Sequence, residues 1–335
     1  MVNILLTDKC VRQCPYCFAG REMARSAATE FLSLENVVYL ADFLRRSGQR
    51  RVSLIGGEPT LHPEFVDIVL YFLARHFEVT VFTSGILSDA RLAEVETYLA
   101  KASPNRLTFV CNVNDPALTP ATDDAGERLA RFLEIAGRWS MLGFNIYRDD
   151  FSLDFAFDLF RRYDLKRTLR LGIAHPTASG ENAFLHVDRI GPAIARLQGF
   201  KADFQRLGIA PSLDCGFPLC QFSDADLGWL VRLGGRANFT CRPAIDITPD
   251  MEVYACFPLA TAERASLFAF DTLEAMMAHF AAQHARLRAD RPGIYDACAT
   301  CEHRARGTCA GGASCQIALE HRTEKWVRFS EKSDA

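Results

Sequence analysis

Residues 2–17 read VNILLTDKCVRQCPYC, a short apolar and β-branched run followed at once by three cysteines. The run over Val2–Thr7 has the length and composition of a β-strand. Because Cys10, Cys14 and Cys17 follow it directly, the sequence predicts that their thiols share one short loop at the carboxyl end of the first strand.

The same succession of a short apolar run and a longer helical stretch continues as far as residue 207. Parallel strands need long return connections, so strands that alternate with helices predict a parallel sheet with the helices outside it. In such a sheet the ligand site lies beyond the carboxyl ends of the strands. The expected strands are Val2–Thr7, Val52–Ile55, Val79–Thr83, Leu107–Cys111, Phe144–Tyr147 and Leu169–Ala174. The expected helices are Leu34–Arg46, Glu64–Arg75, Ala90–Ala100, Ala125–Ser140, Leu153–Tyr163 and a further one near Arg189–Leu207.

Composition and charge narrow the class of protein. The chain has 335 residues and a formal net charge of -3. Single hydrophobic cores stop growing at roughly 250–300 residues, so a large domain with a smaller second unit is expected. The basic residues are scattered, and no apolar run approaches the roughly 20 residues of a membrane helix, which argues against nucleic-acid and membrane partners. Residues 1–9 carry no secretory signal, so a cytoplasmic location is expected, where clustered cysteines more often bind metal than form disulfides.

The carboxyl-terminal part of the chain has a different character. We place the boundary near residue 210, with one unit over residues 1–210 and a second over residues 211–335. Beyond the boundary the sequence offers one helical stretch, Thr272–Leu287, and little alternation of strand and helix. This unit also holds eight cysteines, which are Cys215, Cys220, Cys241, Cys256, Cys298, Cys301, Cys309 and Cys315.

The three amino-terminal thiols suit an iron-sulfur cluster. Three thiolates on one loop ligate three irons of a cubane [4Fe-4S] cluster, which leaves the fourth iron without a protein ligand and open to a cofactor or substrate. A zinc site and unrelated thiols are the alternatives, although a structural zinc site ordinarily recruits a fourth ligand.

The spacing C-x3-C-x2-C, with Tyr16 before the last cysteine, resembles the signature of the radical S-adenosylmethionine (radical SAM) superfamily. The resemblance implies that Cys10, Cys14 and Cys17 hold a [4Fe-4S] cluster with S-adenosylmethionine at its open iron. It also implies an α/β fold, a partial (β/α)6 TIM-type barrel followed by a small cysteine-rich domain for auxiliary clusters.

A second motif, made of Gly56, Gly57, Glu58 and Pro59, follows the second expected strand and resembles the GGEP motif of the same superfamily. The resemblance implies that this turn holds the methionine ammonium group of the cofactor. Glycine allows close backbone approach, and the carboxylate of Glu58 is an anionic acceptor for a cation. A simple strand-ending turn is the alternative.

Polar residues after the later strands are candidates for further cofactor contacts, with turn chemistry as the alternative for each. His175 is expected at the same mouth as a structural histidine, and no catalytic residue is assigned. By the resemblance, the candidates are Ser84 near the methionine carboxylate, Asn112 and Asn114 near the ribose, and Arg148 or Arg170 as the cation that neutralises the carboxylate.

The carboxyl-terminal cysteines resemble the SPASM extension of radical SAM enzymes. Eight thiolates suffice for two fully ligated [4Fe-4S] clusters, and in that extension the ligands of the two clusters are interleaved. By analogy, the nearer cluster takes Cys241, Cys256 and Cys315, and the farther one takes Cys298, Cys301 and Cys309.

Two departures from that pattern stand out. The hairpin glycine usual before Cys256 is replaced, and no cysteine follows Cys315 in this sequence. Cys215 and Cys220 are able to complete one cluster each, but the sequence leaves open which completes which. A single auxiliary cluster with an open or zinc-bound second site is the alternative. Cys111, inside an expected strand, is interpreted as a small buried hydrophobe.

The resemblance also implies a reaction. One electron from the first cluster cleaves S-adenosylmethionine to methionine and a 5'-deoxyadenosyl radical, which removes hydrogen from a substrate. An auxiliary cluster then accepts an electron from the product radical or binds the substrate at an open iron. A flavodoxin or ferredoxin is the expected reductant.

The substrate is predicted at the level of its class. A peptide or protein side chain is the first expectation, recognised by the barrel mouth or by a separate leader-binding protein. A small metabolite or cofactor precursor is the alternative, and a non-catalytic iron-sulfur electron carrier is the second alternative.

Overall fold

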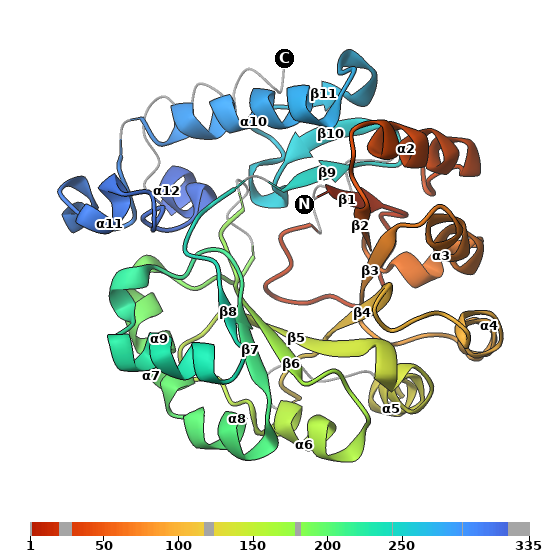
Figure 1. Ribbon diagram of the computed structural model, residues 1–335, viewed down its shortest axis with the longest axis horizontal. Helices are drawn as coiled ribbons and strands as arrows, with labels where there is room; N and C mark the ends of the chain where they lie inside the picture. Colours follow the sequence, from red (N-terminus) through yellow and green to blue (C-terminus); the bar gives the residue numbers. More distant parts are fainter. Residues whose placement is uncertain are drawn as a thin grey trace.

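The computed structural model describes residues 2–19, 29–116, 124–177, 182–242, 244–289 and 291–320. Within these ranges the strands form one 11-stranded sheet, in the order β11-β10-β9-β1-β2-β3-β4-β5-β6-β7-β8. Every neighbouring pair from β1 to β8 is parallel. Figure 1 shows these strands curving around an interior, with the helices outside them. The α/β fold with a partial TIM-type barrel is therefore confirmed.

Most amino-terminal elements lie close to their expected positions, with ends that differ by a few residues. The expected helix near Arg189–Leu207 differs most, because it divides into α7 and α8 around Gly199 and Phe200. The parallel strands are β1 (Val2–Leu5), β2 (Arg51–Ile55), β3 (Glu78–Thr83), β4 (Leu107–Asn112), β5 (Ser140–Ile146), β6 (Thr168–Ile173), β7 (Ala210–Leu213) and β8 (Arg236–Ala237). The helices up to β8 are α2 (Leu34–Arg46), α3 (Phe65–Ala74), α4 (Asp89–Leu99), α5 (Ala125–Ala136), α6 (Asp154–Arg162), α7 (Ile190–Gln198), α8 (Lys201–Leu207) and α9 (Asp224–Arg232).

Helix α2 illustrates why the sequence folds as it does. Ser33 caps its amino terminus by accepting a hydrogen bond from the backbone N–H of Asn36, which satisfies one of the free donors of the first turn. Val37, Leu40 and Leu44 recur at helical spacing and are buried. The helix therefore turns one apolar face to the sheet.

Aromatic packing holds the outer helices against the strands. Val81 of β3 and Phe109 of β4 are direct neighbours in the sheet. Phe109 meets Phe132 of α5 edge to face, with ring centroids 5.4 Å apart, and both rings are fully buried. With the helices fixed outside the sheet, the strand ends and the loops that follow them are left to build a site.

The sheet extends past β6 through β7 and β8, and helix α9 lies between these two strands in the chain. The succession of α9 and β8 contradicts the expectation of little strand and helix alternation after Cys215. Helix α9 begins with a capping box, in which Ser223 and Asp226 exchange side chain to backbone hydrogen bonds. Strand β8 spans only Arg236–Ala237, which is too short for hydrophobic periodicity to reveal.

The carboxyl-terminal part adds to the other edge of the same sheet. β9 (Ile245–Ile247) pairs parallel with β1, and β10 (Glu252–Ala255) and β11 (Ala265–Ser266) follow antiparallel. The sheet thus contains strands from both sides of residue 210, and the unit boundary proposed there stays a prediction. The remaining helices are α10 (Leu273–Leu287), α11 (Glu302–Ala305) and α12 (Ser314–Glu320).

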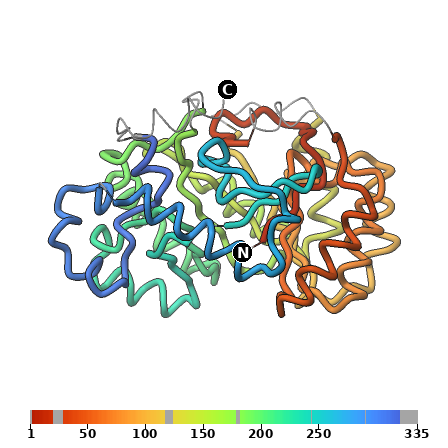
Figure 2. The backbone as a smooth tube through the Cα atoms, turned by 90° about the horizontal axis from the view of Figure 1, so that it is seen from above, coloured from red at the N-terminus to blue at the C-terminus, as the bar shows by residue number. Residues whose placement is uncertain are grey.

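Figure 2 shows the blue carboxyl-terminal segment beside the green segment and across from the red and orange amino-terminal strands. Among the helices of the described ranges, none combines the length and the apolar character that a membrane crossing requires.

Backbone hydrogen bonds fasten the turn after β2 to the loop after β1. The N–H of Gly57 donates to the Thr7 carbonyl oxygen (3.0 Å), and the N–H of Glu58 donates to the Lys9 carbonyl oxygen (2.7 Å). A Cβ at Gly56 would lie 2.3 Å from the Thr7 oxygen, and a Cβ at Gly57 would lie 2.1 Å from the Lys9 oxygen. Gly56 also has a φ of +151°. We call this contact of Gly56 and Gly57 with Thr7 and Lys9 the glycine clamp, and it requires glycine at both positions.

Replacement Gly57→Ala tests the clamp. The new methyl group would overlap a backbone oxygen, and overpacking of this kind costs about 1–3 kcal/mol. We expect the free energy of unfolding of the metal-free protein, measured in urea, to fall by at least that amount. The control is Gly126→Ala in the first turn of α5, where a Cβ meets nothing within 4 Å. The control should be neutral or gain about 0.4–1 kcal/mol, and equal stability of the two variants would refute the clamp.

Candidate functional site

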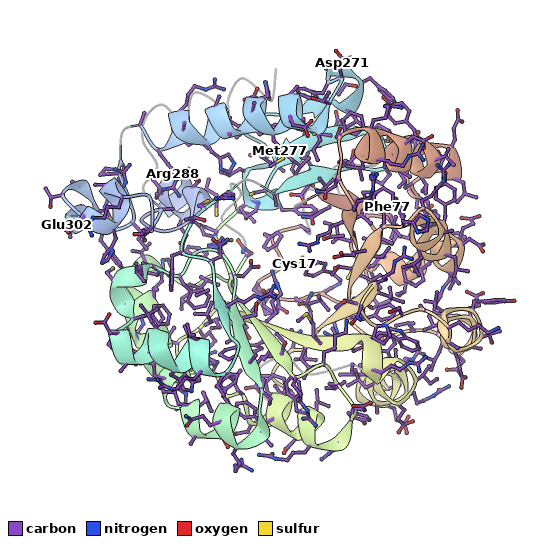
Figure 3. The ribbon with its side chains drawn as sticks, viewed as in Figure 1. Cys17, Phe77, Asp271, Met277, Arg288 and Glu302 are labelled. Atoms are coloured by element: carbon purple, nitrogen blue, oxygen red, sulfur yellow. The ribbon has the colours of Figure 1, made fainter. Side chains whose placement is uncertain are left out.

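The loop after β1 brings the three amino-terminal thiols together inside the ring of strands, where Cys17 is labelled in Figure 3. The backbone N–H of Cys17 donates to the Cys14 carbonyl oxygen (3.0 Å), which closes a tight turn. The pKa of Cys10 is raised to about 11. Burial is the chief cause, and the charges of Glu58, Cys17 and Cys14 contribute. These thiols thus lie within electrostatic reach of one another. Holding them as thiolates requires positive charge, which bound metal supplies.

Side chains from neighbouring strands hold this loop in place. The guanidinium of Arg12, between the first two cysteines, donates to the backbone oxygen of Asn112 at the end of β4 (2.8 Å). Asn114 donates to the Cys14 Sγ (3.4 Å) and accepts from the Tyr16 hydroxyl. Asn114, expected at a ribose, therefore contacts the thiol loop directly. Arg12 was not among the residues predicted from the sequence.

The loop after β6 braces the same segment from the other side. The N–H of Ala183 donates to the Pro15 carbonyl oxygen (2.7 Å), and the Asn182 side chain donates to the carbonyl oxygens of His175 (2.8 Å) and Tyr16 (3.4 Å). The thiol loop is thus fixed to residues that follow β2, β4 and β6.

Asparagines of β4 and β5 line the mouth of the barrel. Within the described residues the buried Oδ1 of Asn112 has no hydrogen-bond partner. A Cβ at Gly143 would lie 2.6 Å from this oxygen, so glycine there leaves it room. Asn145 of β5 lies beside Tyr16. A buried acceptor without a partner costs about 1–3 kcal/mol, and a ligand hydroxyl would remove that cost. This orphaned oxygen fits the ribose contact expected for Asn112.

The carboxylate of Glu58 joins the ends of β2 and β3. It is buried and accepts five hydrogen bonds. Thr60 Oγ1 (2.8 Å), the Thr60 N–H (3.3 Å) and Thr83 Oγ1 (2.7 Å) donate to one oxygen. The N–H (2.7 Å) and Oγ (2.6 Å) of Ser84 donate to the other. Ser84 and Glu58 therefore form one network, and Pro59 begins the short 3-10 helix that Glu58 caps.

The two candidate arginines each pair with an aspartate. Arg148 is half exposed and forms an ion pair with Asp150 (2.6 Å), which raises the pKa of the guanidinium. Arg170 forms an ion pair with Asp214 and lies over the ring of Phe82, 5.3 Å from its centroid. Their role in neutralising the cofactor carboxylate stays a prediction.

His175 lies at the end of β6 against a carboxyl-terminal cysteine. Its Nε2 is 3.8 Å from the Cys215 Sγ. In the described part of the chain its Nδ1 has no partner, and burial lowers its pKa to about 4. Gly216 keeps this contact open, because a Cβ there would lie 2.6 Å from the imidazole ring.

The carboxyl-terminal thiols fall into two sets of neighbours. Burial raises the pKa of Cys215, and the charges of Asp214, Cys241 and Cys256 contribute to the rise. Burial also raises the pKa of Cys315, and the charges of Cys215, Cys241 and Cys256 contribute to that rise. The charges of Cys309, Cys298 and Cys301 likewise act on Cys220. We call the first set, Cys215, Cys241, Cys256 and Cys315, the inner thiol group, and the second set, Cys220, Cys298, Cys301 and Cys309, the outer thiol group.

Cys241 differs from the other members of the inner thiol group. Burial would raise its pKa, but hydrogen bonds with Ser314 and the positive charge of Arg288 help to lower it to about 6. The N–H of Ser314 lies 3.4 Å from the Cys241 Sγ, and Arg288 donates to the Ser314 hydroxyl (2.7 Å). These donors favour a thiolate, the form that binds metal.

The spacing of these side chains differs from that of a single-ion site. In the part of the chain that the structure describes, no three His, Cys, Asp or Glu side chains are close enough to hold one metal ion. A cluster of four irons takes more room, because metal ions and bridging sulfides stand between the thiolates. Cys111 belongs to neither thiol group and is fully buried in β4, in keeping with its interpretation as a small hydrophobe.

Comparison with known proteins finds a match for the part of the chain that carries these motifs. Residues 4–155 match the model of the Radical SAM superfamily. GTP 3',8-cyclase of Desulforamulus reducens is 26% identical over 136 residues, which are 40% of this chain and 39% of that protein. The chain thus matches well under half of the length of this curated relative.

Solved structures resemble a larger part of the chain. The anSMEcpe structure with bound AdoMet has a TM-score of 0.62 at 14% identity, over 100% of this chain and 99% of that chain. SuiB of Streptococcus suis bound to S-adenosylmethionine has a TM-score of 0.56 at 14% identity, over 82% and 65%. Both proteins also have structures with a peptide, Kp18Cys for anSMEcpe and precursor peptide SuiA for SuiB.

The likeness to these structures concerns the fold, and it extends beyond the matched domain into the carboxyl-terminal part. The family model covers the thiol loop, the glycine clamp and the strand ends that surround them. Residues 4–155 of the chain thus match the radical SAM superfamily, and the domain that they form carries the thiol loop and the glycine clamp.

Proposed function

We propose that this enzyme reductively cleaves S-adenosylmethionine at a [4Fe-4S] cluster held by Cys10, Cys14 and Cys17, and that it modifies a peptide or protein side chain. The observation that carries the proposal is the thiol loop, which Arg12 and the glycine clamp fix at the carboxyl ends of the strands. When bound, cluster and cofactor supply a 5'-deoxyadenosyl radical.

The chain's own residues orient the cofactor and keep water out. The turn of Gly56, Gly57 and Glu58 receives the ammonium group, and Ser84 stands beside it through its bonds to Glu58. Asn112 offers its unpaired oxygen to a ribose hydroxyl. Tyr16 closes the loop side of the site, where its ring packs on Tyr147 with centroids 5.3 Å apart.

Two observations bear on the substrate. The anSMEcpe and SuiB structures, which share the fold of this chain, were solved with peptides, and this favours a peptide or protein side chain. The identity to GTP 3',8-cyclase favours a nucleotide or another small metabolite as the second candidate. A flavodoxin or ferredoxin supplies the electron in either case.

Deuterium transfer decides between the candidates. Reconstituted enzyme, S-adenosylmethionine and dithionite are incubated with deuterated GTP or with deuterated forms of the peptides SuiA and Kp18Cys. Mass spectrometry then locates the label. Deuterium in 5'-deoxyadenosine identifies the substrate class, whereas failure to cleave S-adenosylmethionine under any condition would support a non-catalytic electron carrier.

The thiol loop makes a prediction about metal content. Replacing Cys10, Cys14 and Cys17 together by alanine should remove about four irons per chain, the content of one cluster, and abolish cleavage of S-adenosylmethionine. Iron analysis and chromatography of 5'-deoxyadenosine measure the two effects. The control is Cys111→Ala, which should keep both iron and cleavage. Cleavage that persists in the triple variant would assign the active cluster to other cysteines.

The buried carboxylate makes a second prediction. Glu58→Gln keeps the shape but removes the charge, and a charge-assisted hydrogen bond is worth roughly 1.5–3 kcal/mol. The dissociation constant for S-adenosylmethionine, measured by equilibrium dialysis, should therefore rise by about ten- to a hundredfold at constant iron content. Glu64→Gln, at a half-exposed side chain, serves as the control. Unchanged affinity with lowered stability would give Glu58 a structural role alone.

A further inference from the structure

We propose that Arg170 and Asp214, an ion pair on the inner wall of the barrel, hold a main-chain amide group of a peptide substrate and disfavour the phosphates of a nucleotide. We call the pair the arginine–aspartate subsite. This assignment deepens the proposed function and rests on it for the reaction that follows binding. It places Arg170 on the substrate, whereas the sequence alone made it a candidate for the cofactor carboxylate.

The side chain of Arg170 points into the barrel. Its neighbours in β6, Leu169 and Leu171, are buried in the core, and alternation along a strand turns Arg170 to the opposite face. Its guanidinium lies over the ring of Phe82, 5.3 Å from the centroid. Because β4 and β5 separate β6 from the strand of Phe82 in the sheet, this contact crosses the interior around which the strands curve (Figure 1).

The register of the sheet sets Arg170 beside the residues expected to hold the cofactor. Asn112 of β4 stands opposite Gly143 of β5, and Gly143 stands opposite Arg170 of β6. Neighbouring strands are about 4.8 Å apart, so two strand spacings, roughly 10 Å, separate Asn112 from Arg170 along the wall. Asn112 also receives a hydrogen bond from Arg12 of the thiol loop (2.8 Å). The ion pair thus lies next to the cofactor position, where a radical meets its substrate.

A glycine keeps the wall around the ion pair open. Gly172 lies two residues after Arg170 and opposite Asn145 of β5. A Cβ at Gly172 would lie 2.9 Å from the Asn145 Oδ1 and 3.8 Å from a terminal nitrogen of Arg170. Glycine inside a strand often marks a place where a ligand approaches the backbone closely. The strand therefore leaves room for a ligand group between these two polar side chains.

The ion pair retains donors and acceptors for a ligand. The side chains of Arg170 and Asp214 are 25% and 35% exposed, so a ligand is able to reach them. Among the hydrogen bonds of the described residues, the guanidinium makes one, to the Asp214 Oδ2. A guanidinium has five N–H donors and a carboxylate has two acceptor oxygens. A main-chain amide group brings one C=O acceptor and one N–H donor, and the pair matches both.

Charge balance argues against a phosphate at this position. Arg170 is neutralised by Asp214, and Arg148, after β5, is neutralised by Asp150 (2.6 Å). Tight phosphate binding uses guanidinium groups whose charge and paired donors face the anion. A nucleoside triphosphate carries several negative charges and would meet two carboxylates here, and like charges in contact are unfavourable. An uncharged amide group meets no such repulsion.

Two probes test the subsite. They are GTP and tetraalanine capped by an acetyl group and a terminal amide, which offers main-chain amides without charge. Equilibrium dialysis against the reconstituted full chain, with S-adenosylmethionine and without reductant, should show binding of the peptide and none of GTP. Arg170→Gln should weaken peptide binding about tenfold or more, because hydrogen bonds from a charged group are lost. The dissociation constant for S-adenosylmethionine should stay unchanged. Arg161→Gln, which breaks an ion pair on the outer helix α6, is the matched control and should change nothing.

Two further variants separate binding from folding, with circular dichroism and iron content measured for each. Gly172→Ala places a methyl group where only the end of the Asn145 side chain has to shift, so the fold should persist while peptide binding weakens. Asp214→Asn keeps the shape but removes the counter-ion of Arg170, so measurable binding of GTP should appear.

The outcomes that overturn the assignment are distinct. Unchanged peptide affinity in both Arg170→Gln and Gly172→Ala would refute the subsite. Weaker binding of S-adenosylmethionine by Arg170→Gln would give Arg170 to the cofactor. GTP binding by the unmodified enzyme that Arg170→Gln abolishes, or no gain of GTP binding in Asp214→Asn, would refute the exclusion of phosphates. Failure of the reduced enzyme to cleave S-adenosylmethionine would refute the proposed function and leave these binding measurements unaffected.

Discussion

The glycine clamp is the contact on which the rest of the site depends. It joins the loop after β1 to the turn after β2 through backbone atoms. A larger residue at Gly56 or Gly57 could therefore not be accommodated by a change of side-chain rotamer. Because β1 and β2 are parallel neighbours, both connections leave the same edge of the sheet, and the clamp sets the point from which the thiol loop enters the barrel. Arg12 and Asn114 then fix the far side of that loop to β4. The motifs, separate in sequence, form one mechanical unit.

Glu58 extends this unit to the third strand. Its five hydrogen bonds connect the turn after β2 with Thr83 and Ser84 at the end of β3, so the residues expected to hold the ammonium and the carboxylate of the methionine are already linked. These bonds order the carboxylate before a cation arrives, which lowers the entropy cost of ordering it on binding. The same network explains why this turn is both a structural and a binding element.

Much of this arrangement could be predicted from the sequence, and the remainder depends on tertiary contacts. Helix α2 was predicted over Leu34–Arg46, and the thiol loop was predicted because three cysteines directly follow the first apolar run. Strand β8 was not predicted because two residues are too few to show the hydrophobic periodicity of a strand. The role of Arg12 was not predicted because its partner, Asn112, lies 100 residues along the chain on β4. The assignment of Cys215 and Cys220 was undecidable because neighbours in the chain belong to different groups in space.

The loops around α11 have a consequence for the protein in the cell. They carry Cys298, Cys301 and Cys309, and the N–H of Gly311 donates to the Cys309 Sγ (3.3 Å). If these thiols hold iron, iron scarcity would remove the metal bonds that cross-link the loops and would open the loops to proteases, since metal ligation contributes folding energy. The abundance of the enzyme would then follow the iron supply without any dedicated sensor.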